Sequence, residues 1–288
     1  VKPSIQKGYV VSDGTTVLGA DDKAGLAAMF EAIRVLKENE IPRGDIQFVI
    51  TVGEESGLAG AKALDPTLIR AKYGFALDSD GEVGTIVTAA PSQAKINVTI
   101  TGKSAHAGIA PEKGVSAITV AAKAIAKMPL GRIDHETTAN IGRFEGGGAT
   151  NVVADKAYIF AEARSLKDEK LKRQLDTMKT IFERTAEESG VTAEVETKVM
   201  YPSFHYGPED LVVQIAERAA ERIGRKSRLI KSGGGSDANI FSSKGIPTVV
   251  LGVGYENIHT TKERMPISEL NKLAEMVISI VETVAGEK

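Results

Sequence analysis

Several acidic side chains in this sequence directly follow an apolar run or open a helical pattern, and one histidine lies in a loop after such a run. These residues are Asp21, Asp22, Glu54, Glu55, Asp78, Asp80 and His259. In open α/β sheets the carboxyl ends of the strands meet at one edge, where ligands bind. Carboxylates gathered there repel one another, and a divalent cation removes this conflict. The pattern therefore indicates a metal site made of carboxylates and one imidazole.

The absence of cysteine restricts a transition-metal site in this chain to His, Asp and Glu ligands. Zinc accepts such oxygen and nitrogen ligands, and a pair of ions can activate water and polarise a carbonyl group. Each residue also has an ordinary interpretation. Adjacent glutamates are usually solvated, two aspartates can cap a helix, and a lone loop histidine is usually structural. Only the joint arrangement favours the metal site.

The elements that must position these groups alternate between strands and helices at both ends of the chain. Their predicted ranges are a helix to about residue 39, strands at 45–52, 73–77, 226–230 and 248–252, and helices at 209–223 and 268–285, the last capped by Ser268. A short helix should also open at the run GGGSD, residues 233–237. This alternation predicts an α/β domain whose sheet is mostly parallel, with helices on both faces.

The pattern changes in the middle of the chain to the order β-α-β-β-α-β. The predicted ranges are 94–101, 115–128, 138–144, 152–164, 168–189 and 191–199. We therefore predict an inserted α+β domain at 93–205, between a first part of the catalytic domain at 1–92 and a second part at 206–288.

Composition excludes several classes of partner. The net charge is −2, so nothing favours nucleic acid or an anionic membrane. No apolar run approaches the roughly 18 residues that span a bilayer. We therefore expect no nucleic-acid or membrane partner. The lack of cysteine fits a reducing cytoplasm, so we expect a cytoplasmic location.

Six segments, in the same order along the chain, carry a family resemblance. They are GADDKAG at 19–25, TVGEE at 51–55, ALD at 76–78, GKSAHAG at 102–108, GGATNVV at 147–153 and NIH at 257–259. Together they resemble the M20 metallopeptidases, in particular the tripeptidase or peptidase T-like branch. The resemblance covers essentially the whole chain. It implies a zinc-exopeptidase fold with an inserted lid and dimerisation domain.

The resemblance also implies roles for the metal-site residues. Asp21 is expected to bridge two zinc ions, Asp78 to bind one ion, and Glu55 and His259 to bind the other. Asp80 is a weaker rival of Asp78. The family also has an upstream His-x-Asp motif, whereas this sequence has no histidine before His106. We therefore expect a single ion, or manganese or cobalt, as alternatives to two zinc ions.

Other residues are expected to act on water and substrate. The resemblance makes Glu54 the general base, because a carboxylate can take a proton from the activated water and pass it to the leaving amine. Asp22 is placed with it in the catalytic group, joined to Asp21 by a cis peptide bond. The substrate-binding candidates are His106, Asn151, Arg164 and Gly234. His106 would stabilise the oxyanion in a neighbouring subunit, and the Arg164 guanidinium would bind the substrate carboxylate.

The expected function is hydrolysis of the N-terminal residue from short peptides. One alternative is an M20 carboxypeptidase or N-acyl-amino-acid deacylase, because fold does not decide the substrate. Another is an inactive fragment that acts only as a dimerising module, since the His-x-Asp motif is absent from the sequence. We further expect a homodimer through residues 93–205, with strand 94–101 or a helix of that domain at the contact.

Overall fold

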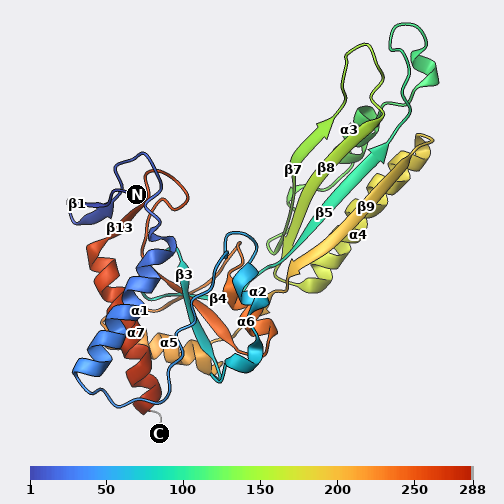
Figure 1. Cartoon of the computed structure of the whole chain (residues 1–288). Coiled ribbons are helices and arrows are strands. Elements are labelled where there is room, and N and C mark those ends of the chain that lie inside the picture. Colours follow the sequence, from blue (N-terminus) through green and yellow to red (C-terminus); the bar gives the residue numbers. More distant parts are fainter. Residues whose placement is uncertain (287–288) are drawn as a thin grey trace. The chain divides into compact units, whose positions relative to one another are not determined.

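The computed structural model describes residues 1–286, which form two compact units (Figure 1). Unit 1 joins the segment Val1–Ala90 to the segment that begins at Phe204, and unit 2 is Pro91–Ser203. Within residues 1–286, no helix is both long enough and apolar enough to cross a membrane.

The central sheet of unit 1 has five strands. These are β3 (Gly74–Ser79), β4 (Thr85–Ala90), β10 (Phe204–His205), β11 (Arg228–Lys231) and β12 (Thr248–Gly252). Strand β12 lies between β3, its parallel neighbour, and β4, its antiparallel neighbour. Strand β4 also pairs with β11 in parallel and with β10 in antiparallel orientation. The sheet is therefore mixed rather than mostly parallel as predicted. Residues 80–84, between β3 and β4, are too few for the crossover of about a dozen residues that parallel strands require.

Helices cover both faces of this sheet (Figure 1), which confirms the predicted α/β class. The helices of unit 1 are α1 (Ala20–Glu38), α2 (Ala59–Ala63), α5 (Leu211–Arg222), α6 (Asp237–Ser243) and α7 (Ile267–Gly286), with a 3-10 turn at Pro66–Leu68. Val249 and Leu251 of β12 pack with α1, α5 and α7. Val250 points to the other face and packs with Ala238 of α6. This alternation is the two-residue period of a strand buried on both sides.

Two local expectations for unit 1 are wrong. Residues 45–52 form no strand, and Ile50 and Val52 are 55% and 77% exposed. A strand requires the amides and carbonyls of a neighbouring strand, and no described strand pairs with this segment. Ser268 is not the N-cap of α7, because the helix already begins at Ile267, whose N–H donates to the Gly8 carbonyl at 3.0 Å.

A small antiparallel sheet lies beside the ends of α1 and α7. Its strands are β1 (Ser4–Gln6), β2 (Tyr9–Val11) and β13 (Arg264–Pro266), with β2 in the middle. The Arg264 guanidinium stacks 4.3 Å from the centre of the Tyr9 ring. Strand β13 connects the loop that contains His259 directly to α7, so this sheet anchors one end of that loop.

Unit 2 is a five-stranded antiparallel sheet with the order β6-β7-β8-β5-β9. Its strands are β5 (Ser92–Thr101), β6 (Gly131–Arg132), β7 (Thr137–Gly146), β8 (Lys156–Ser165) and β9 (Thr192–Tyr201), and its helices are α3 (Ala117–Ala126) and α4 (Asp168–Glu188), with a 3-10 turn at Pro111–Lys113. Both helices pack on one face of the sheet around the fully buried Phe182. The β-α-β-β-α-β order is confirmed, with the short β6 added.

Strand β5 shows the alternation that the sequence predicts. Ala94, Ile96 and Val98 are buried against the helices, whereas Lys95 and Asn97 are exposed on the other face. Strand β5 offers no exposed edge for the expected dimer contact, because it pairs with β8 on one side and with β9 on the other. The long edge strand is β9, which pairs with β5 and with no other described strand.

Candidate metal centre

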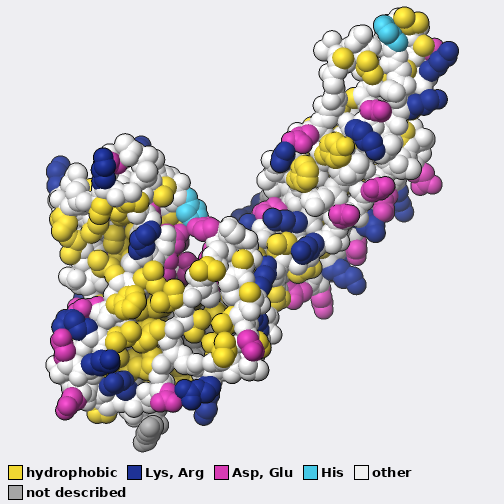
Figure 2. Space-filling model, in the orientation of Figure 1, with side chains coloured by type: hydrophobic (Ala, Val, Ile, Leu, Met, Phe, Trp, Pro, Cys, Tyr) yellow, Lys and Arg dark blue, Asp and Glu magenta, His cyan; other side chains and the backbone are white. Residues whose placement is uncertain are grey.

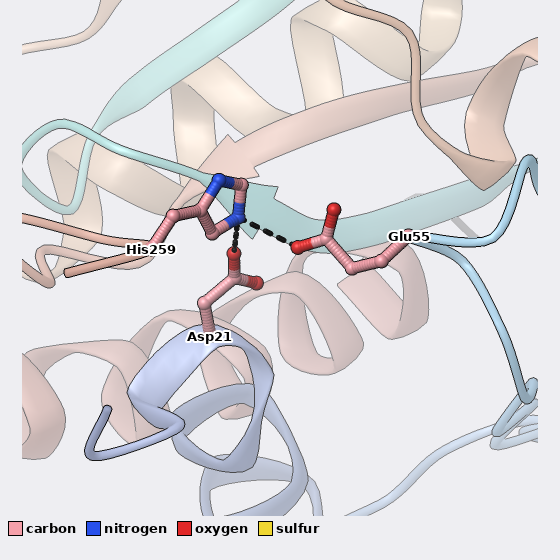
Figure 3. Close-up of side chains that lie close together, drawn as sticks. All are labelled: Asp21, Glu55 and His259. Carbon is pink, nitrogen blue, oxygen red and sulfur yellow. Dashed lines mark hydrogen bonds and ion pairs between the residues drawn. The ribbon is translucent and has the colours of Figure 1, made fainter. Parts of the chain in front are cut away.

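Three side chains from distant parts of unit 1 converge at one point (Figure 3). His259 Nε2 lies 3.1 Å from Asp21 Oδ2 and 2.6 Å from Glu55 Oε1. One ligand atom from each of the three residues lies within 4.8 Å of the other two. Asp21 comes from the start of α1, Glu55 from the loop before α2, and His259 from the loop after β12. Figure 2 shows acidic side chains gathered beside a histidine on this face of unit 1.

The chain departs from helical geometry where α1 begins. Gly19, the N-cap, has φ = 74°, and this left-handed conformation suits glycine. The peptide bond between Asp21 and Asp22 is cis, which confirms the prediction. The Asp22 carboxylate then accepts the Gly25 N–H at 3.0 Å, so it caps the regular part of the helix. Asp21 is left 14% exposed and directed at His259.

Two tight turns present the other side chains. In the loop that contains Glu55, Leu58 N–H donates to the Glu54 carbonyl at 2.8 Å, and Ser56 N–H donates to the Gly53 carbonyl at 3.2 Å. In the other loop, Asn257 and His259 both have positive φ angles, of 57° and 62°. Such angles are uncommon outside glycine, and surrounding structure must hold them. Both side chains at the centre are well exposed, Glu55 at 66% and His259 at 61%.

The electrostatics of the cluster follow from crowded carboxylates. Burial raises the pKa of Asp21, the Glu55 charge raises it further, and His259 partly offsets both. Burial lowers the pKa of His259, but the carboxylates of Glu55 and Asp21 outweigh burial, so its pKa is raised overall. The Asp21 carboxylate thus resists ionisation unless a positive charge compensates it.

Three further acids close to the cluster are perturbed in the same sense. Burial, then the charge of Glu55, raises the pKa of Glu54 to about 7. Burial also raises the pKa of Asp22 to about 7. Burial, then the charges of Glu54 and Asp21, raises the pKa of Asp78 to about 9. Perturbed acids of this kind concentrate at functional sites.

The donor set fits a divalent metal ion. Two carboxylate oxygens and one imidazole nitrogen are the ligands that zinc takes in catalytic sites, where three protein ligands leave one position open. The excess of negative charge around them would be offset by a dication. Asp78 lies outside the group of three. It is the penultimate residue of β3 and is half-buried, and its charge interacts with Asp21 and Asp22.

Sequence reasoning assigned no role to three other residues that surround the cluster. Asp237, at the start of α6, accepts a hydrogen bond from the Thr51 hydroxyl, and its Oδ1 has no hydrogen-bond partner among the described residues. Tyr255 is 3% exposed. Its pKa is raised first by burial and then by the charges of Asp21 and Asp78. Glu263 is 2% exposed and binds the backbone beside Asp21. Glu263 stands between Lys262 and Arg264, so in the sequence it resembles a solvated charge run.

The predicted substrate-binding residues His106 and Asn151 lie side by side in unit 2. Ala107 N–H donates to the Asn151 carbonyl at 2.9 Å, and the backbones of His106 and Val152 form an isolated antiparallel β-bridge. The His106 ring accepts the Gly108 N–H at 3.2 Å. The motifs GKSAHAG and GGATNVV, separated in sequence, therefore form one loop cluster.

Arg164 lies at the opposite end of the unit 2 sheet from that loop cluster. It pairs in register with Gln93, at the start of β5, whereas the loop that contains His106 follows the end of β5 at Thr101. The Arg164 guanidinium donates to the Glu162 carboxylate at 2.8 Å. In unit 1, Gly234 N–H donates to the Ser232 hydroxyl at 3.0 Å, and a Cβ at this glycine would meet only that hydroxyl, at 3.8 Å.

Comparisons with known proteins agree on one family. The profile of peptidase family M20/M25/M40 matches residues 12–283. YqjE of Bacillus subtilis strain 168 is 65% identical over 285 residues, which cover 99% of this chain and 77% of YqjE. The crystal structure of aminopeptidase PepT from Bacillus cereus superposes with a TM-score of 0.94 at 68% identity, covering 99% of this chain and 76% of that one. A tripeptidase from Staphylococcus aureus Mu50 superposes with a TM-score of 0.97 at 55% identity, covering 99% and 76%.

Proposed function

This chain belongs to peptidase family M20/M25/M40 and is a metal-dependent peptidase, and we propose that it removes the N-terminal residue from short peptides at a centre made by Asp21, Glu55 and His259. The convergence of these three side chains carries the proposal. The similar structures named an aminopeptidase and a tripeptidase support the choice of reaction.

The residues of the centre would bind two metal ions of different affinity. Asp21, Glu55 and His259 would hold one divalent ion, which we expect to be zinc. Asp21 and Asp78 would hold a second, weaker one, because two carboxylates without an imidazole suit zinc less well. When bound, such ions supply a Lewis acid that polarises a peptide carbonyl and lowers the pKa of a water molecule.

Glu54 is the general base in this proposal. Its pKa of about 7, raised by burial and then by Glu55, lies near neutral pH, where a base can both accept and return a proton. It neighbours Glu55 in sequence and interacts electrostatically with Asp21, so its carboxylate can take the proton of the attacking water and deliver it to the leaving amine. Asp22 caps the regular part of α1 by accepting the Gly25 N–H.

The remaining expectations rest on the family resemblance. Unit 1 would be the catalytic domain, and unit 2 the lid and dimerisation domain. His106, Asn151 and Arg164 of unit 2, and Gly234 of unit 1, would contact the substrate. The homodimer and the cytoplasmic location stay predictions.

A substrate panel tests the proposed reaction. The metal-loaded chain should release the N-terminal residue from tripeptides faster than it cleaves dipeptides or N-acyl amino acids. Faster cleavage of N-acyl amino acids, or release of C-terminal residues, would replace the proposal with a deacylase or a carboxypeptidase. A titration with zinc should show one tight site, and His259→Ala should remove it.

Glu54→Gln tests the assignment of the base. The amide cannot accept the proton, so tripeptide turnover should fall by about 10²- to 10⁴-fold. Its zinc content should equal that of wild type, because Glu54 is not among the three converging ligands. Asp80→Asn, an exposed acid after β3, is the control and should keep near wild-type turnover.

A further inference from the structure

Glu263 is a buried carboxylate whose two oxygens both bind the turn that contains Asp21. It is 2% exposed. Its Oε2 accepts the Gly19 N–H at 2.6 Å, and its Oε1 accepts the Asp21 N–H at 3.0 Å. Hydrogen bonds from an amide to an ionised carboxylate are stronger than those between neutral groups. Glu263 therefore fixes the backbone of Asp21 from a position 242 residues further along the chain.

The same residue belongs to the loop that presents His259. Within this loop the Thr260 hydroxyl donates to the Asn257 carbonyl at 2.7 Å and accepts the Lys262 N–H at 3.1 Å. Glu263 N–H donates to the Thr260 carbonyl at 3.1 Å. These bonds make a closed turn from residue 257 to residue 263, so the positions of His259 and Glu263 depend on each other.

The first N–H groups of α1 are bound by the distant Glu263 and not by a local N-cap side chain. Helix N-termini leave unpaired N–H groups, which the N-cap side chain usually satisfies. Gly19 has no side chain with which to do so. The carboxylate of Glu263 takes that role from the loop that contains His259, so capping the helix also joins two of the loops that supply metal ligands.

The charge of Glu263 adds to the field at the centre. Its Oε1 lies 3.0 Å from the backbone nitrogen of Asp21. A buried negative charge beside other carboxylates is unfavourable for folding, but it favours a dication. Because burial of this charge is unfavourable for folding, Glu263 fits a role at the metal centre better than a role in stability alone.

We propose that Glu263 is a positioning residue that clamps the Asp21 turn to the His259 loop and thereby sets the separation of two metal ligands. The inference rests on the proposed metal centre. Glu263 is not among the three converging ligands, so its role would be to hold them rather than to bind the ion. Partners that orient metal ligands in this way typically change metal affinity by about 10- to 100-fold when they are replaced.

Glu263→Gln tests the clamp, because glutamine keeps the shape but has only one acceptor oxygen for two N–H donors. The probe is Co²⁺ alone, followed by isothermal titration and by the visible absorption of the bound ion. We expect the Co²⁺ affinity of Glu263→Gln to fall by about 10- to 100-fold and the absorption of the saturated protein to change in shape. Thr260→Ala, at an exposed position in the closed turn, should weaken Co²⁺ binding by a smaller factor even if Glu263→Gln folds poorly.

The matched control is Glu269→Gln, since Glu269 is also a buried glutamate that accepts a distant backbone N–H, that of Val83 at 2.8 Å. It should lose stability but keep the wild-type Co²⁺ affinity and absorption. Unchanged binding and absorption in Glu263→Gln, or an equal loss in Glu269→Gln, would overturn the clamp and leave the metal centre standing. A wild-type chain that binds no Co²⁺ would instead overturn the centre, and the clamp with it.

Discussion

Asp78 provides a quantitative test of the electrostatics of the metal-free centre. Burial and neighbouring carboxylates raise the pKa of Asp78 from 3.8 to about 9. The folded protein therefore holds this proton up to about pH 9, whereas the unfolded chain releases it near pH 4. Folding takes up a proton throughout that window, so rising pH favours the unfolded state. Metal-free wild type should become less stable as pH rises from 7 to 9.

The size of the effect follows from the same shift. Well below the folded pKa, one pH unit changes the free energy of unfolding by about 1.4 kcal/mol. Because this dependence flattens close to the pKa itself, the rise from pH 7 to pH 9 changes the free energy by about 2 kcal/mol. Solvent that reaches this partly exposed side chain reduces the figure to about 1–2 kcal/mol. Asp78→Asn has the same shape and cannot ionise. Its stability relative to wild type should therefore increase by about 1–2 kcal/mol between pH 7 and pH 9.

Urea unfolding at pH 6, 7, 8 and 9, with a chelator present, measures this difference. Asp80→Asn is the control, because its side chain is exposed and lies in the same connection after β3. It should follow the wild-type pH dependence. If the free energies of wild type and Asp78→Asn change in parallel over the whole range, the carboxyl of Asp78 does not hold its proton and the reasoning is wrong.

Two predictions concern unit 2. Phe182→Ala should lower the free energy of unfolding, measured in urea, by about 3–5 kcal/mol, because the ring is fully buried between helix and sheet. Phe144 is 40% exposed, so Phe144→Ala should lower it by less than about 1 kcal/mol. The Lys170 ammonium lies 2.7 Å from Glu136 Oε2 in an ion pair and lowers the pKa of Glu136 below its usual 4.5. The ion pair therefore contributes its full stability above about pH 4.5, and this contribution is lost as the pH falls further. The thermal unfolding of Lys170→Met should accordingly depend less on pH in the acid range than that of wild type. An acid dependence as steep as that of wild type would refute this pairing.

Much of this protein could be predicted from local patterns. The two-residue alternation at 94–101 and the helical period of 168–189 specified the elements of unit 2, because a half-buried strand and an amphipathic helix each impose their own period. The types of residue at Asp21, Glu55 and His259 indicated metal chemistry, since crowded carboxylates and an imidazole are otherwise costly. The strand predicted at 45–52 failed because its apolar pattern shows that burial is favourable but not which neighbour pairs with it.

Only the tertiary structure decided which distant groups meet. The sequence gives no sign that Glu263 binds the amides of Gly19 and Asp21, because a glutamate between two basic residues has the composition of a solvated surface. The position of β12 between β3 and β4, in a mixed sheet, likewise depends on pairings between strands far apart in the chain. Local periodicity reflects which side chains of a segment are buried and which are exposed. The partner of a buried charge or of a strand edge depends instead on how the whole chain packs.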